Sequence, residues 1–184
     1  MLNFDTTLTP DSRLAALDLD NFTFGEIFSD HMFCMDYRDG SWQSGQILPY
    51  GPLSLEPGAM VLHYAQMVFE GLKAFRGDDG VIRLFRPDRN AARMRASCER
   101  ICIPTLDEHL FVEAVKQLVR IDNAWVPNRL GYALYIRPIL FSIEPHLEVR
   151  PSKAFRFLIM TCPVAGYFSH GKVGLSLKVE ENFA

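Results

Sequence analysis

Arg93 is the first residue in this sequence whose surroundings suggest chemistry. It lies in a basic segment that also contains Arg86, Arg89, Arg95 and Arg100. A guanidinium can bind a phosphate through two parallel, charge-assisted hydrogen bonds, so an arginine held in one position is a candidate anion anchor. A run of arginines is also typical of a solvated helix face, and composition alone favours that interpretation.

Tyr135 and Arg137 are a second candidate pair, within the stretch Leu134-Tyr135-Ile136-Arg137-Pro138. A spacing of two residues places both side chains on the same face of a strand. A hydroxyl and a guanidinium that face the same way could bind a carboxylate. The alternative is an exposed sheet face with a surface ion pair, which would contribute little to stability.

The elements that must position these residues alternate between strands and helices. Asp39-Gly40 and Gly77–Gly80 are turn sequences, and each predicts a hairpin between its flanking segments. Strands are predicted where aromatic and β-branched residues are dense, in segments 31–42, 71–76, 81–85, 131–143 and 154–164. The first 25 residues, which include Pro10, predict an irregular arm, and residues 51–57 predict a loop.

Two consecutive helices are predicted between these strands. Pro87 suits the first turn of a helix running to about Ile103, with an apolar stripe of Ala91, Met94, Cys98 and Ile101. Cys98 and Cys102 lie one helical turn apart and are expected to be small core residues. Thr105-x-x-Glu108 resembles a capping box for a second helix, with Phe111, Val115, Leu118 and Ile121 on its inner face.

The order of these elements predicts an α+β fold rather than repeated βαβ units. The 184 residues are 48% hydrophobic and 22% charged, which is the balance of a folded globular chain. A net charge of -3 argues weakly against nucleic acid or an anionic membrane as a partner. The N-terminus lacks a basic-then-apolar leader pattern, so a cytoplasmic location is expected.

Several motifs in this sequence resemble those of branched-chain amino acid aminotransferases, which are pyridoxal-phosphate enzymes of fold type IV. The motifs follow that family's order: Leu62–Arg95, Asn90-Ala91-Ala92-Arg93-Met94, Tyr135-Ile136-Arg137 and Glu144–Val149. The resemblance implies a small N-terminal α+β domain (residues 1–168) with an antiparallel sheet and two consecutive helices. Residues 169–184 would be the interdomain linker and the first strand of a second domain. The implied reaction transfers an amino group from leucine, isoleucine or valine to 2-oxoglutarate in a homodimer with shared active sites.

The resemblance also implies roles for individual residues. Arg93 would contact the phosphate of pyridoxal 5'-phosphate, and Arg137 would help to bind the side-chain carboxylate of glutamate. Leu147 and Val149 would lie on a loop that reaches into the neighbouring subunit's active site, although Glu148 stands where that loop usually has glycine. The remaining substrate contacts implied are Tyr64, Phe69, Tyr135 and Tyr167.

No catalytic residue is expected within this chain, because the lysine that holds the cofactor in that family corresponds to a position beyond Ala184. Lys153, Lys172 and Lys178 lie in other sequence contexts. Two alternatives remain open: another fold-type IV enzyme, acting on D-amino acids or aminodeoxychorismate, and a catalytically inert binding or assembly module. Tyr135-x-Arg137 and the Glu144–Val149 loop favour the branched-chain group.

Overall fold

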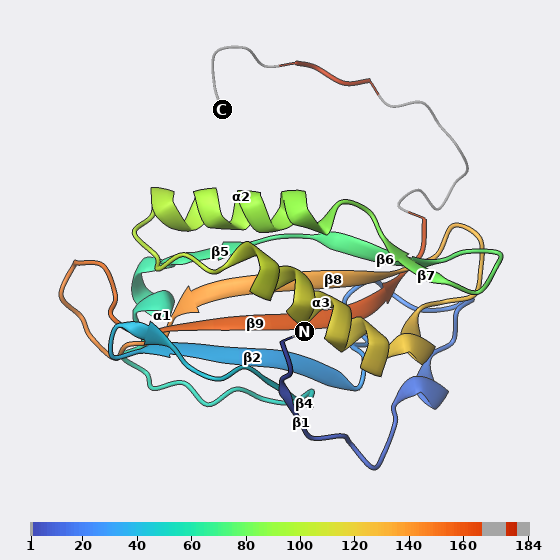
Figure 1. Cartoon of the computed structure of the whole chain (residues 1–184), viewed down its shortest axis with the longest axis horizontal. Helices are drawn as coiled ribbons and strands as arrows, with labels where there is room; N and C mark the ends of the chain where they lie inside the picture. The colour runs from blue at the N-terminus through green and yellow to red at the C-terminus, as the bar shows by residue number, and fades with distance from the viewer. Residues whose placement is uncertain (1, 167–175, 180–184) are drawn as a thin grey trace.

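A computed structural model describes residues 2–166 and 176–179 of the chain. The first of these ranges forms one twisted sheet with helices packed on it (Figure 1). The sheet has nine strands. Their bounds are β1 Asp5–Thr6, β2 His31–Arg38, β3 Ser41–Trp42, β4 Gln46–Pro49, β5 Met67–Phe69, β6 Leu72–Arg76, β7 Ile82–Leu84, β8 Ala133–Ser142 and β9 Phe155–Val164. The helices are α1 Met60–Tyr64, α2 Pro87–Arg100 and α3 Glu108–Ile121, with short 3-10 turns at Leu14–Ala16 and Asn123–Trp125.

The strands run in the spatial order β1-β4-β2-β9-β8-β6-β7, with β3 paired to β2 and β5 paired to β8. Every named pair is antiparallel except β1 with β4. The predicted hairpins at Asp39-Gly40 and Gly77–Gly80 and the two long strands are confirmed. The α+β class with an antiparallel sheet and two consecutive helices is therefore confirmed.

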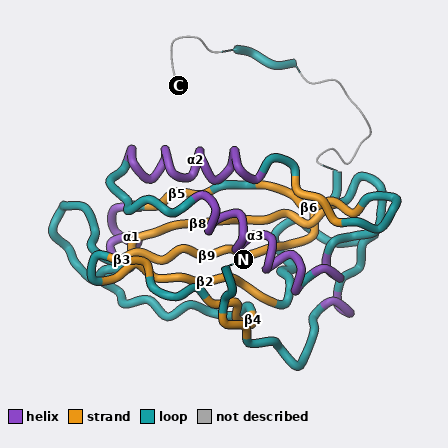
Figure 2. Tube along the Cα trace, viewed as in Figure 1, coloured by secondary structure: helices purple, strands orange, loops and turns teal. Residues whose placement is uncertain are grey.

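Both long helices cover the same face of the sheet, as Figures 1 and 2 show. Phe33 and Met35 of β2 and Phe157 of β9 pack with Met94 of α2 and Phe111 of α3 in one core. Their neighbours on the strands point to the other face, where Met32, Phe141, Ile143 and Leu158 form a second, smaller cluster. This period of two follows from the pleat of a strand.

The predicted helix ends need correction. The first helix ends at Arg100 instead of about Ile103, and Cys102 follows it with a φ of 57° and an exposed side chain. Cys98 is buried as expected, but Cys102 is not a core residue. The capping-box prediction at Thr105 is wrong, because Asp107 is the N-cap of α3 and its Oδ1 accepts a hydrogen bond from Leu110 N at 2.8 Å.

The predicted boundary near the C-terminus falls on residues that are largely outside the described ranges. Tyr167 and most of the predicted linker lie outside the described residues. The first strand of the second domain was predicted within residues 169–184, but the residues described there, 176–179, form neither strand nor helix. The division into domains 1–168 and 169–184 stays a prediction. Across the described ranges, none of the helices is both long enough and apolar enough to span a membrane.

Candidate functional site

Arg93 is held by a carboxylate that the sequence did not single out. Its Nε and Nη2 donate to Oε1 and Oε2 of Glu70 at 2.9 and 2.8 Å, which is a two-point ion pair. Asn90, one turn earlier on α2, donates from Nδ2 to the same Oε2 at 2.7 Å. The Glu70 side chain is 10% exposed, whereas that of Arg93 is 61% exposed. The hydrogen bonds and charge of Glu70 raise the pKa of Arg93 above its ordinary value.

Glu70 lies where the strand pairing with β8 is interrupted. The register continues from Phe69 opposite Ile139 to Leu72 opposite Ile136, so Glu70 faces Pro138. Glu70 N donates to Pro138 O at 2.9 Å. Proline has no N–H to donate in return, which accounts for the break between β5 and β6. Leu72 packs in the core under the helices, and the alternation along the strand turns Glu70 to that same face, beneath α2.

The predicted pair on β8 is confirmed as a contact. Arg137 donates to the Tyr135 hydroxyl from Nη2 at 2.8 Å and from Nε at 3.2 Å. The Arg137 guanidinium carbon lies 4.4 Å from the centre of the Phe69 ring, a cation–π arrangement. Phe69 is 57% exposed, so this cluster opens to solvent on the sheet face away from α2.

Gly71 joins the two groups. A Cβ at this position would lie 2.5 Å from the Tyr135 hydroxyl, so any side chain here would displace that group. On the helix side, Gly71 O accepts from Asn90 Nδ2 at 3.2 Å and Gly71 N donates to Glu70 Oε2 at 3.3 Å. The Arg93 and Arg137 groups are therefore linked through residues 69–71, on either side of one strand.

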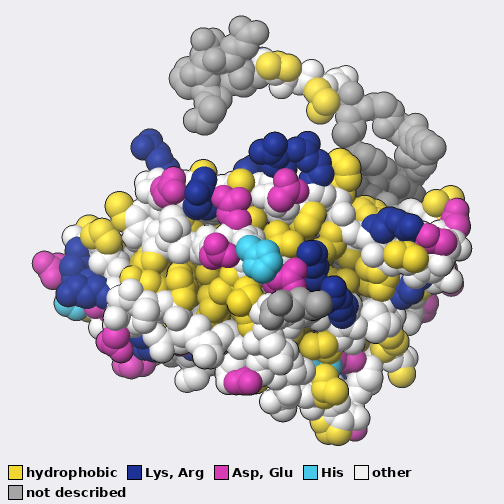
Figure 3. Space-filling view, viewed as in Figure 1, with side chains coloured by type: hydrophobic (Ala, Val, Ile, Leu, Met, Phe, Trp, Pro, Cys, Tyr) yellow, Lys and Arg dark blue, Asp and Glu magenta, His cyan; other side chains and the backbone are white. Residues whose placement is uncertain are grey.

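A groove of about 810 Å³ runs beside α2 and contains the exposed part of Arg93. Its other basic lining residues are Lys73, Arg86 and Arg89, and Phe75 and Phe85 supply an apolar wall. Figure 3 shows Lys and Arg side chains gathered over α2 along the upper edge of this view. The Nη1 group of Arg93 makes no hydrogen bond within the described ranges, so it can donate to an anion. The donor set and the charge of the groove fit a phosphate.

The loop after β8 forms a separate group with α1. Tyr64 donates from its hydroxyl to Leu147 O at 2.5 Å. Leu147 is 64% exposed and Val149 is 83% exposed, so the loop presents two apolar side chains to solvent. Glu148, the residue that replaces the usual glycine, lies 3.1 Å from His146 and 3.6 Å from Arg150. Glu148 thus holds the loop through its contacts with His146 and Arg150, while Leu147 and Val149 are exposed to solvent.

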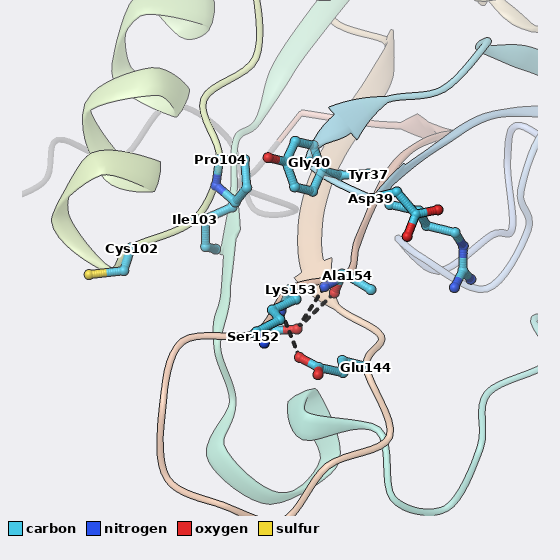
Figure 4. A pocket seen from close by; sticks show the side chains of 11 residues that line it. Tyr37, Asp39, Gly40, Cys102, Ile103, Pro104, Glu144, Ser152, Lys153 and Ala154 are labelled. Carbon is cyan, nitrogen blue, oxygen red and sulfur yellow. Dashed lines mark hydrogen bonds between the residues drawn. The ribbon is translucent and has the colours of Figure 1, made fainter.

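A further cavity, of about 690 Å³, contains none of the predicted site residues. Figure 4 shows Glu144, Ser152, Lys153 and Ala154 at one end, joined by hydrogen bonds, with Cys102, Ile103 and Pro104 from the loop before α3 across from them. The carboxylate of Glu144 is already bound by Arg150 at 2.7 and 3.1 Å. This hydrogen bonding lowers the pKa of Glu144 to about 2. The cavity is therefore not the candidate site.

The predicted residues thus fall into three places. Phe69, Tyr135 and Arg137 lie together, and Arg93 is connected to them through Glu70 and Gly71. Tyr64, Leu147 and Val149 form their own group, and Tyr167 lies outside the described residues. The sequence reasoning missed Glu70 and Asn90. A single acidic residue between apolar strand residues, in Val68-Phe69-Glu70-Gly71, was the available signal for Glu70.

The chain is similar in sequence to several curated enzymes. It is 46% identical over 167 residues to Branched-chain-amino-acid aminotransferase 2 of Bacillus subtilis (strain 168), covering 90% of this chain and 46% of the relative. It is 47% identical over 162 residues to Branched-chain-amino-acid aminotransferase of Mycobacterium tuberculosis (strain CDC 1551 / Oshkosh), covering 87% and 44%. The cytosolic Branched-chain-amino-acid aminotransferase of Mus musculus is 45% identical over 170 residues, covering 91% and 44%. The chain thus spans about half the length of the curated relatives it matches.

Solved structures show the same fold. A branched-chain aminotransferase from Thermoproteus uzoniensis, with norvaline, superposes with a TM-score of 0.57 at 20% identity, over 76% of this chain and 43% of that one. A second branched-chain amino acid aminotransferase, with pyridoxamine 5'-phosphate, gives a TM-score of 0.54 at 23% identity, over 74% and 41%. No protein-family model matches the chain.

Proposed function

We propose, from the premise that this chain is a relative of the branched-chain-amino-acid aminotransferases, that it supplies the phosphate anchor and the side-chain pocket of such an enzyme. The reaction proposed is the transfer of an amino group from leucine, isoleucine or valine to 2-oxoglutarate, with pyridoxal 5'-phosphate as cofactor. The observation that carries the proposal is the placement of Phe69, Tyr135 and Arg137 in one cluster linked through Gly71 to Glu70 and Arg93.

The phosphate end of the site would be the groove beside α2. Arg93 would donate its remaining N–H groups to the cofactor phosphate, in a groove that Lys73, Arg86 and Arg89 make positive. When bound, pyridoxal phosphate supplies the electron sink for the reaction, and the protein supplies binding and orientation.

The Phe69–Tyr135–Arg137 cluster would hold the substrate side chain. The Phe69 ring offers an apolar wall to an aliphatic side chain, whose burial contributes roughly 1.5–3 kcal/mol. Arg137 would donate to the side-chain carboxylate of glutamate or 2-oxoglutarate. The two functions are compatible because Arg137 already has the Tyr135 hydroxyl and the Phe69 ring as partners when no carboxylate is bound.

A second copy of the chain is proposed as the partner that covers the loop after β8. Leu147 and Val149 of this loop are exposed. Leu62 is 61% exposed and lies on α1, the helix whose Tyr64 bonds the loop at Leu147. Exposed apolar groups of this kind are typical of a surface that is buried in an assembly. The proposal is therefore a homodimer in which Leu147 and Val149 contribute to the neighbouring site.

The proposed activity is tested with the full-length protein that carries this chain. L-Leucine and 2-oxoglutarate, with pyridoxal phosphate, should give glutamate and the corresponding branched 2-oxo acid, both measured by chromatography. D-Alanine in place of L-leucine should give no product. Transfer from D-alanine without transfer from L-leucine would assign the chain to another fold-type IV activity.

The phosphate anchor has its own test. Arg93→Ala removes a charge-assisted contact to the phosphate, so the Kd for pyridoxal phosphate should rise about ten- to a hundredfold. Arg89→Ala is the matched control, because Arg89 lies on the same helix and lines the same groove but has only a 3.7 Å contact with exposed Asp88. Equal losses of affinity from the two substitutions would show that α2 offers only a diffuse basic face and that Arg93 is not a specific anchor.

A further inference from the structure

We propose that Glu70 is the positioning residue for Arg93, fixing the guanidinium so that its free donors face the groove beside α2. The inference rests on the proposed function in one respect, which is that the anion in the groove is the cofactor phosphate. The geometry of the pair does not depend on that identification.

The bonds between Glu70 and Arg93 fix the guanidinium in direction as well as in place. Two parallel bonds, at 2.9 and 2.8 Å, use the Nε–Nη2 edge of the planar group. A planar fork held along one edge cannot rotate about its last bonds without breaking both contacts. The opposite edge, with Nη1, is left for a ligand in the groove that Arg93 lines.

The carboxylate is itself held from several directions. Asn90 Nδ2 donates to Oε2 at 2.7 Å, and Gly71 N donates to the same oxygen at 3.3 Å. The side chain is 10% exposed and lies under α2. A buried carboxylate with this many donors has little freedom to move, so it is a fixed support for the exposed Arg93 side chain.

The other arginines of α2 show that this support is specific to Arg93. Arg89 meets Asp88 at 3.7 Å with both side chains about two-thirds exposed (65% and 67%). Arg95 meets Glu108 at 3.1 Å with exposed fractions of 53% and 39%. Within the described ranges, Arg93 alone on this helix has a nearly buried carboxylate as its partner.

Two effects of Glu70 on phosphate binding oppose each other. Its negative charge weakens the attraction of the site for an anion, whereas its hydrogen bonds remove the cost of ordering Arg93 on binding. Arg93 is 61% exposed, so solvent screens the first effect. We therefore expect positioning to dominate, and removal of Glu70 to weaken phosphate binding.

Glu70→Gln is the most informative substitution, because it keeps the size of the side chain. The amide of glutamine has one acceptor oxygen, while Arg93 Nε, Arg93 Nη2 and Asn90 Nδ2 all donate at this point. One donor must then face the amide NH2 group, and the two-point contact with Arg93 is lost. The Kd for pyridoxal phosphate should rise on the order of tenfold, as for other supports of a ligand-binding group.

The experiment uses the full-length protein, stripped of cofactor, and measures the Kd of pyridoxal phosphate and of pyridoxal, which lacks the phosphate. Glu70→Gln should weaken only the phosphorylated ligand, whereas a structural defect would weaken both. In the Arg93→Ala background, Glu70→Gln should cause no further loss, because its effect passes through Arg93. Asp36→Asn is the matched control, since Asp36 forms a comparable two-point pair with Arg156, at 2.7 and 2.9 Å, on β2 and β9.

Several outcomes overturn the proposal. Equal losses for both ligands, additive losses in the double variant, or tighter phosphate binding by Glu70→Gln would each do so. If Arg93→Ala weakens pyridoxal phosphate and Glu70→Gln does not, this inference fails while the proposed function stands. If the wild-type protein binds the two ligands equally, the proposed function fails as well. Thermal unfolding of each variant checks its fold. If Glu70→Gln does not fold, Glu70→Asp replaces it: this variant withdraws the carboxylate by one methylene and should give the same phosphate-specific loss.

Discussion

Arg137 has partners of two chemical kinds before any ligand binds. The Tyr135 hydroxyl accepts its hydrogen bonds, and the face of the Phe69 ring lies 4.4 Å from its guanidinium carbon. A cation over an aromatic ring at a partly exposed site contributes about 0.5–1 kcal/mol. Neither contact uses the Nη1 group, so Arg137 can donate from Nη1 to a carboxylate without first giving up these contacts.

Arg137→Met should therefore separate the two halves of the proposed reaction. Methionine keeps much of the apolar stem, so packing is largely preserved. Leucine has no side-chain charge and should react at a nearly unchanged rate, whereas glutamate should react more than tenfold more slowly. Single-turnover rates in the full-length enzyme, with each amino acid in turn, measure the two effects. Equal slowing of both would mean that Arg137 has a structural role only.

Phe69→Ala is the complementary variant. It removes the apolar wall and leaves the carboxylate partner, so leucine should lose about 1–3 kcal/mol of transition-state binding and glutamate much less. A larger loss for glutamate would show that the ring acts mainly by holding Arg137, through the cation–π contact.

The site residues differ in how far the sequence could predict them. Tyr135 and Arg137 are two apart on one strand, so their shared face follows from the pleat alone. Arg93 stood out from its basic neighbours only by resemblance. Glu70 and Arg93 are 23 positions apart, and their pairing depends on how α2 lies over the edge of the sheet. No local pattern encodes that placement.

At the scale of elements, the start of α3 allows a direct test of which residue, Asp107 or Thr105, caps the helix. Asp107 is the N-cap and bonds Leu110 N at 2.8 Å, so Asp107→Ala should lower the free energy of unfolding by about 1 kcal/mol. Thr105→Ala is the control, because the bond that this residue makes, from Trp42 Nε1, is to its backbone oxygen. Urea unfolding followed by circular dichroism measures both. A larger loss of stability for Thr105→Ala would support the capping box predicted from the sequence instead of Asp107 as the N-cap.

Long elements were predicted well because each carries its sequence signal over ten or more residues. Helices α2 and α3 each bury one face with a helical period, and strands β8 and β9 are ten residues each and dense in aliphatic and aromatic residues. Short elements outside the two predicted hairpins were not predicted. Strand β4 and helix α1 have four and five residues, and their position depends on partners elsewhere in the chain, such as Phe33 for Ile47. The end of α2 was missed because Cys102 takes a positive φ, which a non-glycine residue rarely does.

At the scale of the whole molecule, the sheet separates the two ends of the proposed site. Alternation along residues 69–72 turns Glu70 toward α2 and Phe69 toward Arg137. The proposed phosphate anchor and the proposed side-chain pocket thus share one strand and its break opposite Pro138. Stability of the sheet edge is consequently a condition for both ends of the site.

The irregular N-terminal arm is fastened to this sheet by Asp30. Its carboxylate accepts hydrogen bonds from Ser12 Oγ at 2.6 Å, Arg13 N at 2.7 Å and Trp125 Nε1 at 2.9 Å. Burial alone would raise the pKa of Asp30, but the bonds from Ser12, Arg13 and Trp125 outweigh it and lower the pKa below 3.8. One side chain therefore joins the arm, the start of β2 and the turn after α3.

Asp30→Asn should lower the free energy of unfolding by about 1–3 kcal/mol at pH 7, because an amide NH2 group would face donors that now bind a carboxylate. A carboxyl group whose pKa is depressed by folding stabilises the protein above its unfolded pKa, near 3.8, and this contribution is lost as the pH falls below that value. The wild-type protein should thus lose more stability between pH 5 and pH 3 than Asp30→Asn does. Asp11→Asn, the same change at an exposed position of the arm, should leave both quantities within about 0.5 kcal/mol of wild type. Urea unfolding of the three proteins at several pH values measures the free energy of unfolding. Parallel pH profiles for wild type and Asp30→Asn would show that Asp30 does not cause the loss of stability at low pH.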